Sequence, residues 1–112
     1  CFTNKLTELD LSRNTELTYL DCEENPLTKL DVSANTKLET LSCAANSLTT
    51  LDVSANTALT WLSCENNPGD RESKFPITAW FDNETRPESL SINYLSWVYN
   101  NRDTTIDFRK AE

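Results

Sequence analysis

Residues 17–27 read LTYLDCEENPL, and the same pattern returns twice along the chain. It recurs as LETLSCAANSL over residues 38–48 and, slightly altered, as LTWLSCENNPG over residues 59–69. The shared template is LxxLxCxxNxL, and consecutive copies lie 21 residues apart. A second regular stretch lies between the copies and reads LTELDLSRNTE, LTKLDVSANTK and LTTLDVSANTA. The chain up to Pro68 is therefore one 21-residue unit repeated.

The repeat keeps its phase at every characteristic position. The residues in phase are Cys1, Cys22, Cys43 and Cys64; Leu9, Leu30 and Leu51; Leu20, Leu41 and Leu62; and Asn14, Asn35 and Asn56. A unit of this length cannot bury its own apolar face, so each coil must stack on the next. We therefore expect a β-rich solenoid, a right-handed leucine-rich repeat coil of 21-residue units with a C-terminal β cap.

Each unit contains two segments that we expect to be extended. The first covers residues 9–11, 30–32 and 51–53, with leucines inward and an aspartate outward. The second covers residues 20–22, 41–43 and 62–64. Asparagines mark the bends, where their amides can bond to backbone groups left unpaired at strand ends. These residues are Asn4, Asn25, Asn46 and Asn67 at one bend, and Asn14, Asn35 and Asn56 at the other.

The repeat register breaks at Gly69. A charged connector, GDRESK, leads into a segment in which leucine gives way to aromatics, Thr and Ile. Residues 75–81 are expected to form a strand, and residues 97–99 and 104–108 a hairpin. We thus divide the chain into a repeat solenoid, residues 1–68, and a capping β-hairpin segment, residues 69–112. The cap aromatics either cover the last coil, which we favour, or line a sugar site; they are Trp80, Phe81, Trp97, Tyr99 and Phe108.

Four cysteines in a short chain can indicate disulfides. Here neighbouring coils would hold successive cysteines at about 4.8 Å with parallel Cβ bonds, which disfavours the right-angled torsion of a disulfide. We expect a stack of buried free thiols that act as small hydrophobic side chains. Cys1 is in register with this ladder, so we interpret it as part of a preceding coil rather than as the first residue of a lipoprotein, and we expect the repeats to continue upstream.

The chain of 112 residues is acidic, with 18 Asp and Glu against 10 Lys and Arg. This charge argues against nucleic acid and anionic membranes as partners. No apolar run is long enough to span a membrane, and no signal peptide is recognisable. We expect a mature or trimmed soluble fragment.

No group of residues in the sequence predicts catalysis, a cofactor or a metal site. The chain contains no His, and its single Gly excludes phosphate-cradling loops. A zinc site would require CxxC pairs. The column of Asp10, Asp31 and Asp52 could suggest a calcium-binding site, since carboxylate oxygens are calcium ligands. We instead expect these carboxylates to accept hydrogen bonds from nearby Ser, Thr or backbone donors within DxSxNT.

The segment LTKLDVSANTKLETLSCAANSL resembles the 21-residue leucine-rich repeats of bacterial surface proteins. These include the cysteine-ladder branch of the internalins and similar proteins of Bacteroides-like bacteria. The resemblance covers residues 1–68, although the array is short and shows neither the internalin N-terminal cap nor a wall-anchoring motif. It implies a secreted or surface-attached bacterial protein that binds other proteins or host-cell surfaces.

The binding surface is predicted from differences between coils. The outward positions of the DVS segment scarcely vary, whereas those of the LxC segment do, which leaves them free to match a partner. We expect Tyr19 and Trp61 to anchor a protein ligand, with acidic neighbours attracting a basic partner. The predicted ligand-binding residues are Tyr19, Asp21, Glu23, Thr40, Ser42, Ala44, Trp61, Ser63 and Glu65. A carbohydrate-binding module and a structural spacer are the alternatives.

Overall fold

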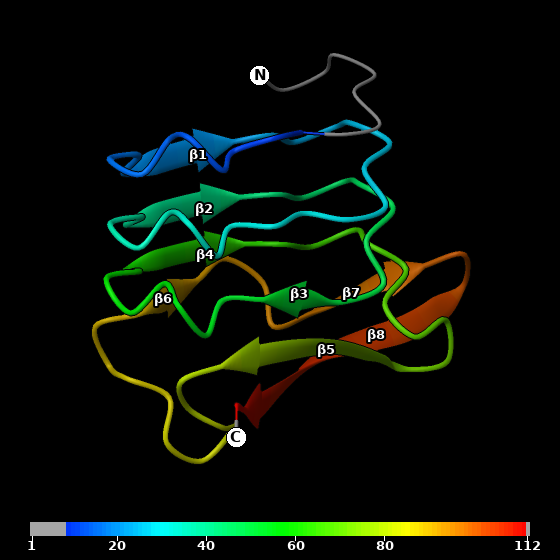
Figure 1. Cartoon of the computed structure of the whole chain (residues 1–112). Coiled ribbons are helices and arrows are strands. Elements are labelled where there is room, and N and C mark those ends of the chain that lie inside the picture. The colour runs from blue at the N-terminus through cyan, green and yellow to red at the C-terminus, as the bar shows by residue number, and fades with distance from the viewer. Residues whose placement is uncertain (1–8, 112) are drawn as a thin grey trace.

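The chain forms two β-sheets that enclose one hydrophobic core (Figure 1). The computed structural model describes residues 9–111, and this part of the chain contains strands but no helix, so it holds none that could cross a membrane. Sheet A consists of β1 (Tyr19–Asp21), β2 (Thr40–Ser42), β4 (Trp61–Ser63) and β6 (Ser91–Ile92). Sheet B consists of β3 (Leu51–Asp52), β5 (Lys74–Ala79), β8 (Arg102–Lys110) and β7 (Ser96–Tyr99).

The 21-residue period fixes the register of β1, β2 and β4 in sheet A. Tyr19 of β1 pairs with Thr40 of β2, and Thr40 pairs with Trp61 of β4, always in parallel. Because every coil has the same length, each strand lies beside its equivalent in the next coil, and Figure 1 shows β1, β2 and β4 as successive rungs. The strands start one residue before the predicted segments.

The prediction of extended segments in the DVS half of each coil is only partly correct. Of residues 9–11, 30–32 and 51–53, only Leu51–Asp52 forms a strand, and Asp31 joins Asp52 in an isolated bridge. The chain turns at once after each aspartate, because the Asp31 carboxylate accepts the backbone N–H of Ser33 at 2.9 Å. Such an Asx turn competes with a longer strand.

Asparagine amides close the bends, as the sequence predicts. The Asn46 side chain donates to the carbonyls of Cys43 and Ala44 in its own coil and to that of Cys22 in the coil before. Its Oδ1 accepts the N–H of Leu27 at 3.2 Å. Asn56 likewise bridges two coils, donating to the carbonyls of Val32 and Asn35. These contacts satisfy buried backbone groups where no strand does so. Asn4 lies outside the described residues.

The C-terminal strands continue both sheets. Leu51 of β3 pairs with Ile77 of β5, and Leu62 of β4 pairs with Ile92 of β6. The predicted strand at residues 75–81 and the predicted hairpin are confirmed as β5 and as the antiparallel pair β7 and β8. Asn100 and Asn101 form the hairpin loop with φ values of 49° and 64°, which a type I′ turn requires. The division at residues 68 and 69 stays a prediction.

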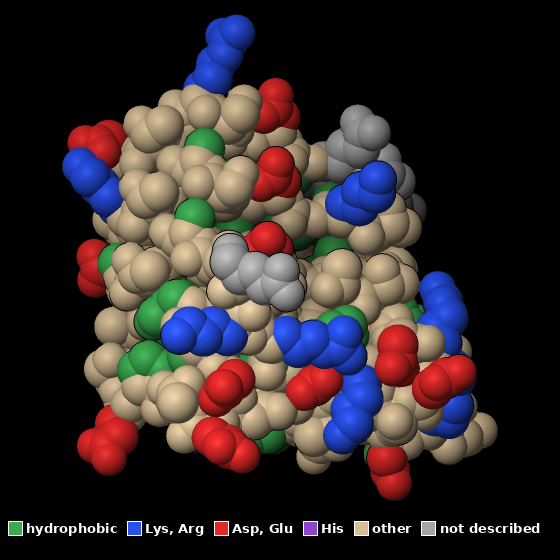
Figure 2. All heavy atoms as spheres, turned by 60° about the horizontal axis from the view of Figure 1, so that its bottom comes forward, with side chains coloured by type: hydrophobic (Ala, Val, Ile, Leu, Met, Phe, Trp, Pro, Cys, Tyr) green, Lys and Arg blue, Asp and Glu red, His purple; other side chains and the backbone are tan. Residues whose placement is uncertain are grey.

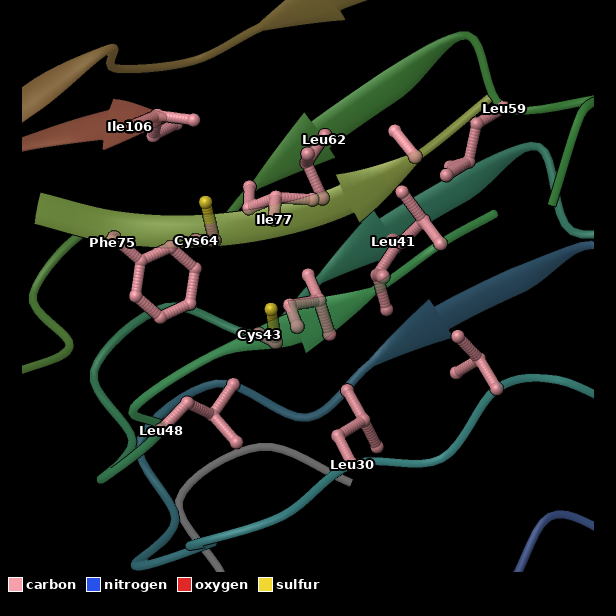
Figure 3. Packing of buried hydrophobic residues seen from close by; sticks show 14 of the residues in the cluster. Leu30, Leu41, Cys43, Leu48, Leu59, Leu62, Cys64, Phe75, Ile77 and Ile106 are labelled. Atoms are coloured by element: carbon pink, nitrogen blue, oxygen red, sulfur yellow. The ribbon is translucent and has the colours of Figure 1, made fainter. Parts of the chain in front are cut away.

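Leucines and cysteines of the repeats pack directly against aliphatic and aromatic side chains of the cap (Figure 3). Among the cap aromatics, Phe81, Trp97 and Phe108 are buried, and Trp80 and Tyr99 pack against the core while partly exposed. Phe81 contacts Phe108 at a ring-centroid distance of 4.7 Å. These rings therefore lie in or against the core that the C-terminal strands share with the repeats, in line with the favoured interpretation.

Candidate functional site

Two aromatic side chains project from the outer face of sheet A. Tyr19 is 62% exposed and Trp61 is 38% exposed. They lie in one column across the strands, with the half-buried Thr40 between them in register. Because neighbouring strands lie about 4.8 Å apart, the two aromatic residues are separated by about 9.6 Å along this column. Leucines at the next position of each strand point into the core, so strand alternation places the rings outside.

Acidic side chains flank this column on the side where the strands end. Asp21, Glu23 and Glu65 are half-buried. The expectation that Ser42, Ala44 and Ser63 are equally accessible is wrong, because their exposed fractions are only 7%, 5% and 2%. Three of the nine predicted residues therefore lie beneath the surface.

Hydrogen bonds explain the burial of the two serines. The Ser42 hydroxyl donates to Oε1 of Glu23, which belongs to the preceding coil. The Ser63 hydroxyl donates to Oε1 of Glu65 at 2.6 Å, and the Asn93 amide donates to the other oxygen of Glu65 at 3.4 Å. The glutamates thus cover the serines, and the serines hold the carboxylates in place.

We call the exposed and half-exposed part of this surface the aromatic–acidic face. It consists of Tyr19, Thr40, Trp61, Asp21, Glu23 and Glu65. The sequence prediction missed the positioning roles of the serines and of Asn93. The only local signal was the Ser-x-Glu spacing of Ser63 and Glu65, since Glu23 meets Ser42 across coils and Asn93 reaches the site from the cap.

The cysteine ladder lies under this face and offers no reactive group to it. Cys22, Cys43 and Cys64 are free thiols without exposed surface. Burial raises the pKa of Cys22 to about 11, with the nearby Asp21 charge adding to the shift. Burial likewise raises the pKa of Cys43 and of Cys64 well above the usual thiol range. The thiols therefore stay protonated and act as core side chains. Cys1 lies outside the described residues.

The carboxylates of the aspartate column form hydrogen bonds within their own coils. Asp10, Asp31 and Asp52 accept hydrogen bonds from the backbone N–H and the hydroxyl of the serine two residues later, as the sequence predicts. The hydroxyl hydrogen bonds of Ser12 and Ser33 lower the pKa of Asp10 and of Asp31. Within residues 9–111, no group of three His, Cys, Asp or Glu side chains is arranged to hold a metal ion.

A groove of about 460 Å³ lies beside this column, between residues 28–33 and 49–55. Threonine, serine and aspartate side chains line it, and no aromatic ring does. Figure 2 shows that acidic and basic side chains are interspersed on the face of the molecule toward the C-terminal strands, where hydrophobic side chains are few. Among the described residues that line it, the groove thus has no aromatic ring to pair with its aspartates, unlike sheet A.

No family model matches the chain, and no curated protein does. Among solved structures, the chain is similar to the functional domain of InlJ from Listeria monocytogenes, described as including a cysteine ladder. The two share 30% sequence identity with a TM-score of 0.66, over 98% of this chain and 24% of that one. The chain thus spans about a quarter of the length of that domain. The match supports a relationship to internalin-like repeats.

Proposed function

We propose that this chain is a non-catalytic protein-interaction module that binds a protein ligand on the aromatic–acidic face. The observation that carries the proposal is the pair of exposed rings, Tyr19 and Trp61, in one column of sheet A beside carboxylates held by buried serines. Aromatic side chains offer large contact area at a low entropic cost and are enriched in binding hot spots. Fixed carboxylates add selectivity for a basic partner.

The proposal extends to the architecture and location of the protein. We infer that the 21-residue units form a right-handed leucine-rich repeat solenoid and that the protein is secreted or attached to a bacterial surface, where it meets host or cell-surface proteins. The parallel 21-residue register of sheet A and the similarity to the InlJ domain support this inference.

Carbohydrate binding by the cap is less well supported than protein binding by sheet A. A sugar platform requires exposed aromatic faces. Of the predicted cap aromatics, Phe81, Trp97 and Phe108 are instead buried, and Phe75 packs edge-to-face on Trp97 at 5.7 Å. Trp80 and Tyr99 are only partly exposed. Carbohydrate binding and a purely structural role as a spacer are therefore kept as alternative outcomes of the experiment.

The test compares the double variant Tyr19→Ala and Trp61→Ala with the parent against a panel of purified cell-surface proteins and a glycan array. Any protein that binds the parent should bind the double variant more than about tenfold more weakly, because the two anchors are lost. The double variant should still melt cooperatively, at a lower temperature because Trp61 is more than half buried, and its melting curve is recorded to show that it is folded.

The matched control is Val98→Ala. Val98 is 62% exposed, as Tyr19 is, but it belongs to sheet B, so its removal should leave binding unchanged. Full binding by a folded double variant would refute the proposed face. Binding of glycans without proteins would favour the carbohydrate-binding alternative.

A further inference from the structure

We propose that the ligand of the aromatic–acidic face is a peptide segment in the polyproline II conformation, with proline at every third residue and Lys or Arg between the prolines. This inference rests on the proposed function and specifies its partner by conformation and charge. It follows from the spacing of two rings, the residue between them and the side on which the carboxylates lie.

The spacing of the rings matches the pitch of a polyproline II helix. Tyr19, Thr40 and Trp61 are consecutive partners in the parallel register, so the two aromatic residues lie two strands, about 9.6 Å, apart. A polyproline II helix has three residues per turn and rises about 3.1 Å per residue, hence about 9.3 Å per turn. A peptide lying across the strands would therefore present one proline to each ring in successive turns.

Thr40 leaves room between the rings. It is smaller than either aromatic side chain and half-buried, so the column reads large, small, large across β1, β2 and β4. A flat platform would have a third ring at this position. A column with a small residue between two rings instead suits a ridged ligand whose proline rings project once per turn, as in aromatic-lined grooves that bind proline-rich segments.

The position of the carboxylates indicates where the ligand should carry basic side chains. Asp21, Glu23 and Glu65 all lie on the same side of the aromatic column, toward the ends of the strands. In a helix of three residues per turn, every third residue projects in the same direction. A peptide with a basic residue at one fixed position per turn would thus direct all its cations toward these acids. The net charge of −8 attracts such a peptide over a longer range.

The first experiment measures binding of two synthetic peptides to the whole chain by calorimetry. One repeats Pro-Pro-Arg, and the other repeats Gly-Gly-Arg with the same length and charge but without a preference for polyproline II. The proline peptide should bind more than about tenfold more tightly, because its bound conformation is preformed. Equal affinity of the two peptides would overturn the inference and leave only electrostatic attraction.

Variants identify where the proline peptide binds. Trp61→Ala should weaken its binding more than about tenfold, and Val98→Ala should not. Glu23→Gln combined with Glu65→Gln should weaken binding and reduce its dependence on salt, because fewer ion pairs remain to be screened. Unchanged binding in a Trp61→Ala variant that still melts cooperatively would overturn the assignment of the site.

The variant Thr40→Tyr distinguishes a ridged ligand from a flat one by the direction in which binding changes. A tyrosine there replaces the small residue between the two rings, so binding of the proline peptide should fall although an aromatic ring is gained. A neutral oligosaccharide such as cellohexaose, if it stacked on this column, should bind more tightly to the same variant. Stronger binding of the proline peptide to Thr40→Tyr would contradict the inference.

Failure of this inference is distinguishable from failure of the proposed function. If a protein from the panel depends on Tyr19 and Trp61 while the proline peptide does not bind, the face binds protein in another conformation, and only the inference falls. If neither the panel proteins nor the peptide depends on these two residues, both fall.

Discussion

At the scale of single residues, the cysteines show how one side-chain type serves packing alone. Cys43 is fully buried in the middle of the ladder, and loss of hydration raises its pKa because a buried thiolate is costly. Cys22 retains a weak contact, its Sγ lying 3.5 Å from the carbonyl oxygen of Ser42. The ladder therefore contributes apolar contact rather than chemistry.

The thiols should be unreactive while the chain is folded. In a Cys1→Ser background, Cys22, Cys43 and Cys64 should resist a thiol reagent at pH 8 and react together once denaturant is added. Their raised pKa values keep them protonated, and burial denies the reagent access to the sulfur atoms. Mass spectrometry after timed labelling measures this. A disulfide among the three, or rapid labelling of the native chain, would contradict it.

At the scale of structural elements, the turn after each repeat strand of sheet A, β1, β2 and β4, contains a left-handed residue. Glu24, Ala45 and Asn66 occupy this position in successive coils, with φ values of 58°, 56° and 61°. Gly69 has a φ of 59° where the chain leaves the repeats, and its N–H donates to the carbonyl of Leu48 at 3.1 Å. At Gly69, unlike Ala45, neighbouring backbone also leaves no space for a side chain.

Gly69→Ala should lower the free energy of unfolding by more than about 2 kcal/mol. The left-handed conformation alone costs a non-glycine residue about 1–2 kcal/mol. An added Cβ would also lie 2.3 Å from the carbonyl oxygen of Lys74. Urea denaturation followed by circular dichroism gives the value.

The control is Ala45→Gly, which should change the free energy of unfolding by less than about 1 kcal/mol. Relief of the left-handed strain offsets the greater freedom of glycine in the unfolded chain. Parental stability in Gly69→Ala would mean that the turn rearranges and that the close contact with Lys74 is dispensable.

At the scale of the whole molecule, the repeats and the cap share one core. The rings of Phe75 and Trp97 and the side chain of Ile77 belong to the same cluster as the leucines of the repeats. The indole N–H of Trp97 donates to the carbonyl of Asn67 at 2.9 Å, which connects β7 to the last repeat. Backbone pairing of β5 with β3 and of β6 with β4 covers one edge of each of these two repeat strands.

Removal of residues 75–112 should therefore abolish cooperative folding. The fragment 1–74 would expose the apolar end of its last coil and two unpaired strand edges, which favour aggregation. Size-exclusion chromatography and thermal melting of the fragment beside the complete chain measure the effect. A monomeric fragment that melts cooperatively would show that the repeats are stable without the cap.

The cap was only partly predictable from sequence. Alternation and the Asn-Asn turn were sufficient for β5 and for the hairpin of β7 and β8. β6 was missed because Ile92, not a leucine, pairs with Leu62, and it lies 30 residues away rather than 21. No local pattern encodes a pairing between strands whose spacing departs from the repeat.

The sequence by itself determined the period, the inward leucines and cysteines, the asparagine bends and the outward positions of Tyr19 and Trp61. These follow from local alternation and from coils of equal length, which repeat the same environment. Only the tertiary structure decided that Ser42 and Ser63 are covered and that Glu23 and Glu65 are held above them. The physical reason is that accessibility depends on side chains from neighbouring coils and from the cap, which contact a residue in space but not in sequence.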